Sequence, residues 1–291
     1  MNQVISDEQI KFYQDNGYLL VKGVIPGAII QQANASIEAL LKHEPLSEVA
    51  ELEPKNSKLA RRIWSPTKRI TCLNEISRNS TLLDILECLI GSNIFYHYSK
   101  LNIKAPQVGS EVAWHQDFSY YPHTNTDLVS ALIHLDKATP ENSCLQVLPA
   151  AHKLGLLDHY IDGHFRGKLS EVIIERTQIE PVALSVEPGD VIFLHCLLPH
   201  YSSVNNSNRY RKVFIPAYRA TDAFPIYFGT HAAHNEPSIE LLRGKRSDFA
   251  RVTIQGNCKL PFAERPFNSL YQIQEGSHLG AAEIAGYYSD R

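Results

Sequence analysis

The sequence predicts a mainly β protein in which helices flank a β-barrel. Apolar residues recur with helical spacing in several stretches before residue 93. From Ile94 onward, short apolar runs alternate with clusters of Pro, Gly, Asn and Asp, a pattern typical of an all-β sandwich or barrel. No strong linker separates the two parts. We therefore expect one domain over residues 1–291, in which helices of 1–93 pack on a barrel of 94–220 and 221–291 form a C-terminal extension.

The chain is expected to begin with a helix and a strand. Ser6 precedes Gln9 by three residues, which is the spacing of a capping box at a helix start. Asn16-Gly17 then predicts a turn into Tyr18-Leu19-Leu20-Val21, a run suited to a buried strand.

Two further helices are expected before the barrel. Ile29 to His43 carries apolar residues near the 3.6-residue period, and Leu82 to Ile90 is a short amphipathic stretch that Gly91 ends. Between them, residues 44–68 are polar and contain three prolines, so we expect an irregular loop there.

Six apolar runs predict the strands of the barrel. Each is short and is bounded by turn-forming residues, as strands are. The runs cover residues 94–104, 128–136, 144–148, 182–186, 191–198 and 212–218.

The charge of the chain is nearly balanced. Lys and Arg number 28 against 31 Asp and Glu, a formal net charge of −3. This balance gives no electrostatic reason to bind nucleic acid or an anionic membrane, and we expect neither as a partner. No window approaches twenty uninterrupted apolar residues, and the first residues lack an apolar run with basic flanks, so neither a membrane span nor a secretory signal is expected.

The five cysteines are scattered and form no CxxC pair. That pattern argues against a disulfide framework and against a thiolate zinc site. It fits a reducing compartment, and we expect a cytoplasmic protein.

A group of two histidines and one aspartate indicates a metal site. In an extended strand, residues two apart point to the same face, so His115 and Asp117 could reach one metal while Gln116 turns away. His200 lies far downstream after a predicted strand. Two imidazoles and a carboxylate form the facial triad of non-haem Fe(II) oxygenases, which leaves positions for a co-substrate and dioxygen. His195 competes as the distal ligand, although a structural hydrogen bond is the commoner role for such a histidine.

Arg211 strengthens this hypothesis. It follows His200 by eleven residues and lies beside the apolar run Val213-Phe214-Ile215. An arginine inside a barrel needs an anionic partner, because an unpaired buried charge is very costly. A dicarboxylate that chelates iron at one end offers its other carboxylate to a guanidinium.

Several motifs together resemble the phytanoyl-CoA dioxygenase family of Fe(II)/2-oxoglutarate oxygenases. The resemblance covers roughly residues 5 to 220 and rests on an ordered set of motifs. They are DEQIKFYQDNGYLLVKGVIP, KAPQVGSEVAWHQD, DLVSALIHLDKATPENSCLQVLPAAHK and EPGDVIFLHCLLPHYSSVNNSNRYRK. The resemblance implies a double-stranded β-helix, the jelly-roll barrel of the cupins.

The resemblance also implies roles for individual residues. His115, Asp117 and His200 match the iron ligands. Arg211 matches the arginine that binds the C5 carboxylate of 2-oxoglutarate, and Ser202 matches a position that often assists it.

Four more residues receive expected roles near the pocket. Asn102 matches an asparagine that contacts 2-oxoglutarate in the ectoine-hydroxylase branch, and we expect it to point into the barrel. Lys100 would then lie near the barrel mouth, where it could meet an anionic group of substrate or co-substrate. The alternative is a strand whose polar side faces water. Tyr120 and Tyr121 occupy positions that face the substrate in the family, although aromatic residues there could also belong to the core, and for Tyr121 the two roles are equally compatible.

The chain departs from the family pattern at three glycines. Ser143, Ala150 and Tyr201 stand where glycine is usual, which puts local turn geometry and pocket width in question. Asp117 retains the carboxylate that halogenating relatives lack, which favours hydroxylation.

These observations predict an enzyme that uses Fe(II), 2-oxoglutarate and O2 to hydroxylate an aliphatic carbon of a small molecule, releasing succinate and CO2. A small polar substrate is favoured over an acyl-CoA. Two alternatives stay open: a zinc hydrolase with the same two histidines and aspartate, and a non-catalytic cupin-like binding module.

Overall fold

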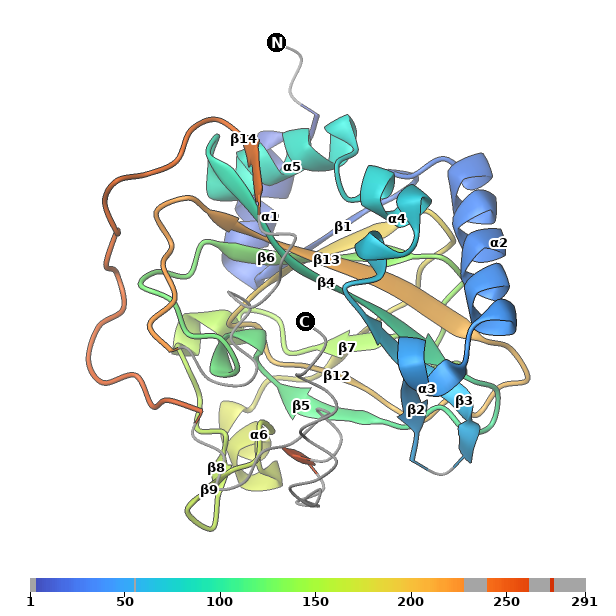
Figure 1. The fold of residues 1–291 in the computed structure, drawn as a ribbon. Coiled ribbons are helices and arrows are strands. Elements are labelled where there is room, and N and C mark those ends of the chain that lie inside the picture. The colour runs from blue at the N-terminus through green and yellow to red at the C-terminus, as the bar shows by residue number, and fades with distance from the viewer. Residues whose placement is uncertain (1–3, 55, 228–239, 262–272, 275–291) are drawn as a thin grey trace.

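The computed structural model describes residues 4–54, 56–227, 240–261 and 273–274, and its strands form two main antiparallel sheets (Figure 1). The helices α1, α2, α4 and α5 lie on one side of the larger sheet, and the smaller sheet lies on its other side. Among the described residues, no helix has the length and hydropathy needed to span a membrane.

The larger sheet contains eight strands in the described part of the chain. Its central strands β6, β13 and β4 pair antiparallel along most of their length. The order is β1 (Tyr18–Val21), β11 (Val191–His195), β6 (Leu128–His134), β13 (Arg211–Ala220), β4 (Ile94–Lys104), β3 (Asn56–Trp64) and β2 (Glu51–Glu53), and β14 (Glu240–Arg243) pairs with β4.

The smaller sheet faces the larger one across an apolar layer. It has the order β10 (Val182–Leu184), β7 (Leu145–Val147), β12 (His200–Ser202) and β5 (Val112–His115), and β8 (Tyr160–Ile161) and β9 (His164–Phe165) form a separate hairpin. Leu145 and Val147 pack in one buried cluster with Leu132 and Val213 of the larger sheet. The described strands therefore form a two-sheet jelly roll, and their hydrogen bonding does not close into a ring.

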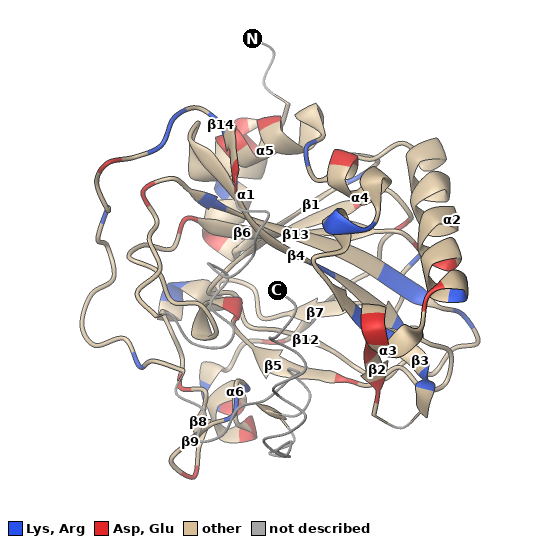
Figure 2. Cartoon of the chain, viewed as in Figure 1, with Lys and Arg blue, Asp and Glu red and all other residues tan. Residues whose placement is uncertain are grey.

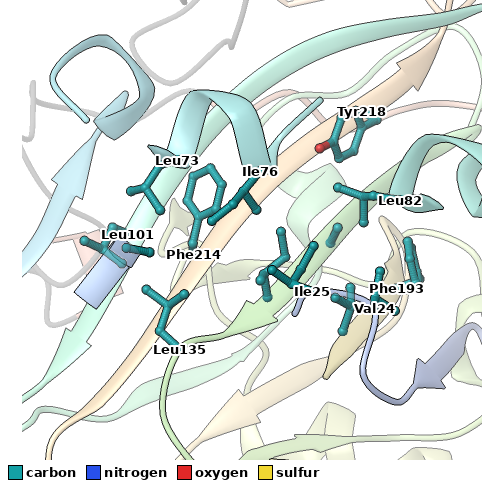
Figure 3. Close-up of a cluster of buried hydrophobic side chains, with 14 of the residues drawn as sticks. Val24, Ile25, Leu73, Ile76, Leu82, Leu101, Leu135, Phe193, Phe214 and Tyr218 are labelled. Carbon is teal, nitrogen blue, oxygen red and sulfur yellow. The ribbon is translucent and has the colours of Figure 1, made fainter. Parts of the chain in front are cut away.

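The main core lies between the larger sheet and the helices (Figure 3). Leu73, Ile76 and Leu82 of the helices pack against Leu101 and Phe214 of the sheet, all with relative exposures of 2% or less. The helices are α1 (Asp7–Asn16), α2 (Gly27–His43), α3 (Leu46–Val49), α4 (Thr71–Ile76), α5 (Ser80–Ile90) and α6 (Glu171–Thr177), with 3-10 turns η1 (Pro66–Lys68), η2 (Asp117–Ser119) and η3 (Ala151–Leu154).

The start of α1 confirms the predicted capping box. The Ser6 side chain accepts a hydrogen bond from the Gln9 backbone, and the Gln9 side chain accepts one from the Ser6 backbone. Gly17 ends the helix with φ +79°, and a Cβ there would lie 2.6 Å from Nδ1 of His152, so the turn into β1 needs glycine.

The prediction of a loop over residues 44–68 is wrong. This segment contains α3, β2, β3 and η1, and β3 pairs with β4 in the larger sheet. The strand was hidden because the residues buried on β3 include Arg61 and Arg62, so its buried positions do not show the apolar pattern of an ordinary strand.

The C-terminal extension contributes to the larger sheet where it is described. Glu240–Arg243 forms β14 and pairs with the first half of β4. Much of the remainder of 221–291 lies outside the described residues.

Candidate metal centre and co-substrate pocket

Three side chains converge between the two sheets to form a candidate metal centre. His115 ends β5, Asp117 begins η2, and His200 begins β12. His115 and His200 are direct cross-strand partners, and their ring centroids lie 4.1 Å apart. One potential ligand atom from each of the three residues lies within 4.8 Å of the others, and all three side chains are buried.

Backbone carbonyls orient both imidazoles. Nδ1 of His115 lies 2.8 Å from the carbonyl oxygen of Ala113, and Nδ1 of His200 lies 2.9 Å from that of Leu198. A carbonyl can only accept, so each Nδ1 carries the proton and each Nε2 keeps its lone pair. The two Nε2 atoms lie 3.8 and 3.9 Å from Oδ1 of Asp117, so all three donors face one point.

A hydroxyl group fixes the carboxylate of Asp117. Ser130 of β6 donates to Oδ2 of Asp117 at 2.9 Å, which leaves Oδ1 directed at the histidines. Carboxylate and histidine ligands in metal sites are commonly held by such outer hydrogen bonds.

Gln116 turns away from this centre, as the strand alternation predicts. Its Nε2 donates to the carbonyl oxygens of Gly155 and Leu197, and its Oε1 accepts from the backbone N–H of Leu157. These bonds fix the segment between the two ligand positions from its far side.

The electrostatics favour metal-binding protonation states. Burial lowers the pKa of both His115 and His200 below the usual value for histidine. Burial alone would raise the pKa of Asp117, but the positive charge of Lys100, together with the nearby histidines and the hydrogen bond from Ser130, outweighs it and holds that pKa below its usual range. The site thus presents two neutral imidazoles and one carboxylate, the forms that bind a divalent metal.

The three residues line a cavity of about 520 Å³, a volume that includes its open mouth. Its wall combines a few charged and polar groups with aliphatic side chains from both sheets. The other lining residues are Arg62, Lys100, Asn102, Val112, Leu132, Leu145, Leu194, Tyr201, Ser202, Arg211, Val213 and Ile215.

Arg211 lies on the pocket wall at the start of β13, where it is 4% exposed. Within the described structure its Nε has no hydrogen-bond partner, and burial lowers its pKa to about 10. Its cross-strand partner Lys104 donates to the carbonyl oxygens of Ser202 at 3.1 Å and of Ser203. Arg211 is therefore a buried cation that is open to an anion from the pocket.

Two polar residues of β4 face the pocket. Lys100 and Asn102 line it, whereas Leu101 and Ile103 are buried in the core on the opposite face. Nζ of Lys100 lies 3.7 Å from Oδ1 of Asp117.

Arg62 is a pocket residue that the sequence reasoning missed. Its Nε donates to Oδ1 of Asn102 at 2.8 Å, and its guanidinium lies 5.1 Å from the ring centroid of Trp64. Acidic residues of β2 and basic residues of β3 gather at this end of the sheet (Figure 2). The available signal was the Arg61-Arg62 pair itself, which lies in the segment that was expected to be an irregular loop and is instead on strand β3.

Tyr120 and Tyr121 are buried beside the pocket and do not line it. The hydroxyl of Tyr120 donates to the carbonyl oxygen of Gly167, and its ring centroid lies 5.9 Å from that of His115. Tyr121 contacts Tyr98, with hydroxyl oxygens 3.4 Å apart. Contact between either tyrosine and a substrate stays a prediction.

His195 lies apart from the three converging residues. Its ring centroid is 5.0 Å from that of His152 and 6.2 Å from that of Tyr13. The structure thus brings His200, and not His195, together with His115 and Asp117.

At two of the positions where the family usually has glycine, the backbone keeps the conformation that glycine would adopt. Ser143 has φ +74° and Ala150 has φ +64°, both in the left-handed region. The turns therefore persist at a modest conformational cost. Tyr201 has a different effect: the residue is part of the pocket lining, and its ring stacks on Trp114, which is not, at 5.3 Å between ring centroids.

Comparisons with known proteins agree with this geometry. The family model described as Phytanoyl-CoA dioxygenase (PhyH) matches residues 13–213. The probable alpha-ketoglutarate-dependent hypophosphite dioxygenase of Stutzerimonas stutzeri is 29% identical over 75% of this chain and 80% of its own length. The peroxisomal phytanoyl-CoA dioxygenase of Homo sapiens is 30% identical over 77% of this chain and 71% of its own length.

A solved structure supports the fold. The crystal structure of EctD from S. alaskensis in its apoform has a TM-score of 0.69 at 23% identity, over 84% of this chain and 89% of that one. The jelly-roll fold that the sequence predicts is confirmed.

The donor set also fits the metal of this family. Two neutral imidazoles, whose Nδ1 atoms are hydrogen-bonded, and one carboxylate suit Fe(II). The buried Arg211 in the same pocket suits the free carboxylate of a dicarboxylate that chelates the iron. From the family match and this geometry, the chain belongs to the phytanoyl-CoA dioxygenase family and is a 2-oxoglutarate-dependent dioxygenase that uses Fe(II), 2-oxoglutarate and O2.

Proposed function

We propose that this enzyme hydroxylates an aliphatic carbon of a small molecule and converts 2-oxoglutarate and O2 into succinate and CO2. The observation that carries the proposal is the pairing, in one cavity, of a His-Asp-His group with a buried arginine whose Nε has no partner in the described structure. The first suits a metal, and the second suits the far carboxylate of a metal-chelating dicarboxylate.

His115, Asp117 and His200 would hold the iron. With 2-oxoglutarate and O2, bound Fe(II) supplies the oxidising chemistry. The protein holds the ligands in position: the carbonyl oxygens of Ala113 and Leu198 orient the two imidazoles, and the Ser130 hydroxyl orients the carboxylate.

Arg211, Asn102 and Ser202 would bind 2-oxoglutarate. The guanidinium would grip the C5 carboxylate, with Ser202 beside it on the facing sheet. Asn102 would donate through its amide nitrogen, since its oxygen already accepts from Arg62. Leu132, Leu194 and Val213, which line the cavity, would keep water out.

Tyr120, Tyr121 and Lys100 are the proposed substrate neighbours. The cavity volume of about 520 Å³, open mouth included, favours a small substrate over an acyl-CoA. The peroxisomal relative is named for an acyl-CoA, whereas the Stutzerimonas relative is named for hypophosphite, so the family includes substrates of both kinds.

We also propose that residues 1–291 act as one domain in the cytoplasm. The support for one domain is the core cluster that α1, α2, α4 and α5 share with the larger sheet. The support for the cytoplasm is the presence of five free cysteines without a disulfide among the described residues.

A substrate screen tests the proposal. Candidate small molecules are incubated with Fe(II), 2-oxoglutarate and labelled O2, and both succinate and hydroxylated product are measured. The proposal predicts stimulated succinate formation and label from O2 in a new hydroxyl group.

Two histidine variants provide a matched pair for the same assay. His200→Ala should abolish turnover, whereas His195→Ala should retain it. Retention in His200→Ala would remove this histidine from the site.

A further inference from the structure

The pocket carries more positive than negative charge. Arg62, Lys100 and Arg211 line it against a single carboxylate, Asp117. The positive charge of a divalent metal and the negative charges of the two 2-oxoglutarate carboxylates sum to zero, so loading the site leaves this balance unchanged. Even if Glu51, 3.6 Å from Nη1 of Arg62, is taken to neutralise that arginine, one positive charge remains uncompensated. The loaded site therefore attracts a further anion.

Lys100 is the cation that metal binding leaves without an anion. Its Nζ lies 3.7 Å from Oδ1 of Asp117, the same oxygen that faces both Nε2 atoms. A metal bound to Oδ1 neutralises the carboxylate charge that Lys100 faces, and it adds a positive charge close to the lysine. The lysine is only 9% exposed, so water compensates poorly for this loss.

Arg62 lies on the neighbouring strand and faces the same space. The register pairs Arg62 with Asn102 and Trp64 with Lys100, which puts the arginine and the lysine in adjacent rows of one sheet face. In the described structure, Nη1 of Arg62 has no hydrogen-bond partner. The two cations thus offer donors to one small group.

The co-substrate's far carboxylate cannot satisfy these donors if it binds Arg211. Arg211 pairs with Lys104, four residues along β4 from Lys100. Four residues of strand span about 13 Å. The near carboxylate would be bound to the metal, so the positive charge that the count leaves over is available to a further anion near Lys100.

The cavity also limits the size of that anion, because its volume is about 520 Å³ with the open mouth included.

We propose that the substrate is a small oxyanion, a carboxylate or phosphonate, whose charged group binds Lys100 and Arg62 with its aliphatic part toward the metal. This inference rests on the proposed function. It adds the chemical class of the substrate.

Calorimetry on protein loaded with Mn(II) and 2-oxoglutarate tests the inference without turnover. The probes are two pairs of similar shape: butanoate with butanamide, and methylphosphonate with its neutral dimethyl ester. At least one anion should bind about tenfold or more tightly than its neutral partner, as loss of a charge-assisted contact implies. Equal or weaker binding of both anions, or no binding of either, overturns the inference.

Three lysine variants identify the residue responsible. Lys100→Met should reduce anion affinity about tenfold and change 2-oxoglutarate affinity less than about threefold, whereas Lys100→Arg should retain the preference. Lys212→Met is the matched control, because it removes the same charge from a lysine that lies 3.7 Å from Asp136 and does not line the pocket.

The two proposals fail in different ways. If Lys100→Met weakens 2-oxoglutarate binding and leaves anion binding intact, the lysine serves the co-substrate: the substrate inference falls and the oxygenase proposal stands. If wild-type protein binds neither Mn(II) nor 2-oxoglutarate, both fall.

Discussion

The two faces of β4 between Lys100 and Lys104 differ in how their buried side chains are used. Leu101 and Ile103 are 0% and 2% exposed and pack in the main core under the helices. On the other face, Lys100, Asn102 and Lys104 are also largely removed from water, yet they are charged or polar. One face follows the ordinary rule of burial, and the other violates it.

This difference separates stability from function on a single strand. Burying apolar surface stabilises the fold, whereas burying a cation costs free energy unless a partner compensates it. Burial lowers the pKa of Lys100, and it lowers the pKa of Lys104 further with the help of the nearby charges of Arg211 and Arg61. The cations on the pocket face can therefore bind anions, and the apolar packing of the core face stabilises the strand that carries them.

Leu101→Ala should have the largest effect on stability. Removing a fully buried leucine leaves a cavity, and we expect the free energy of unfolding to fall by about 2–5 kcal/mol. Denaturant unfolding measures this loss, and Leu101→Met should cost less than about 1.5 kcal/mol. The folded fraction should bind 2-oxoglutarate as the wild type does; weakened binding would show that the two faces are not independent.

Arg211→Ala should have the reverse effect, with weaker 2-oxoglutarate binding and little loss of stability. Loss of a charge-assisted bidentate contact should weaken 2-oxoglutarate binding by about 2–3 kcal/mol. Stability should fall little, because the buried guanidinium has an Nε without a partner in the part of the chain that is described. Calorimetry with Mn(II)-loaded protein measures the affinity. An unchanged affinity would remove Arg211 from the co-substrate site.

Acid should destabilise the protein through buried histidines. His134 of β6 is fully buried, neither ring nitrogen has a partner among the described residues, and burial lowers its pKa to about 3. Between the unfolded pKa of about 6.5 and about 3, the unfolded chain binds a proton that the folded one does not. Stability is therefore full above about pH 6.5 and falls by up to about 1.4 kcal/mol per pH unit below it.

His134→Leu isolates this contribution. The variant should lose less stability than the wild type between pH 7 and pH 5, as measured by urea unfolding at each pH. An identical pH dependence would show that His134 does not carry the effect.

Ser202→Ala should have the smallest effect. A neutral hydroxyl that assists Arg211 contributes about 1 kcal/mol, so 2-oxoglutarate affinity should fall about fivefold. Ser203→Ala, one residue farther along, is a control outside the pocket lining, and it should leave the affinity unchanged. Equal behaviour of the two variants would contradict the proposed role of Ser202.

The sequence predicted those parts of the structure whose signals are local. The capping box at Ser6, the runs that became β4, β6, β11 and β13, and the helix ended by Gly91 all follow from spacing and turn residues. Strand alternation also grouped Asn102 with Lys100 and Lys104 on one face, and the family resemblance indicated that this face points into the barrel. These features depend on neighbours in the chain.

The rest depended on contacts between distant segments. β3 was missed because Arg62 occupies a buried position, and only its pairing with β4 explains why an arginine is tolerated there. The anchors of the metal centre, such as Ser130 on Asp117, join residues whose relation appears only in the folded chain. No periodicity in the sequence predicts them.

The central claim is that His115, Asp117 and His200 bind the iron that 2-oxoglutarate chelates. Anaerobic titration of the protein with Fe(II) and then 2-oxoglutarate tests it most directly. The wild type should develop a weak visible charge-transfer band that saturates with one iron per chain, and Asp117→Ala should lose it or require far more Fe(II). Absence of the band in folded wild-type protein, or an unchanged band in Asp117→Ala, would contradict the claim.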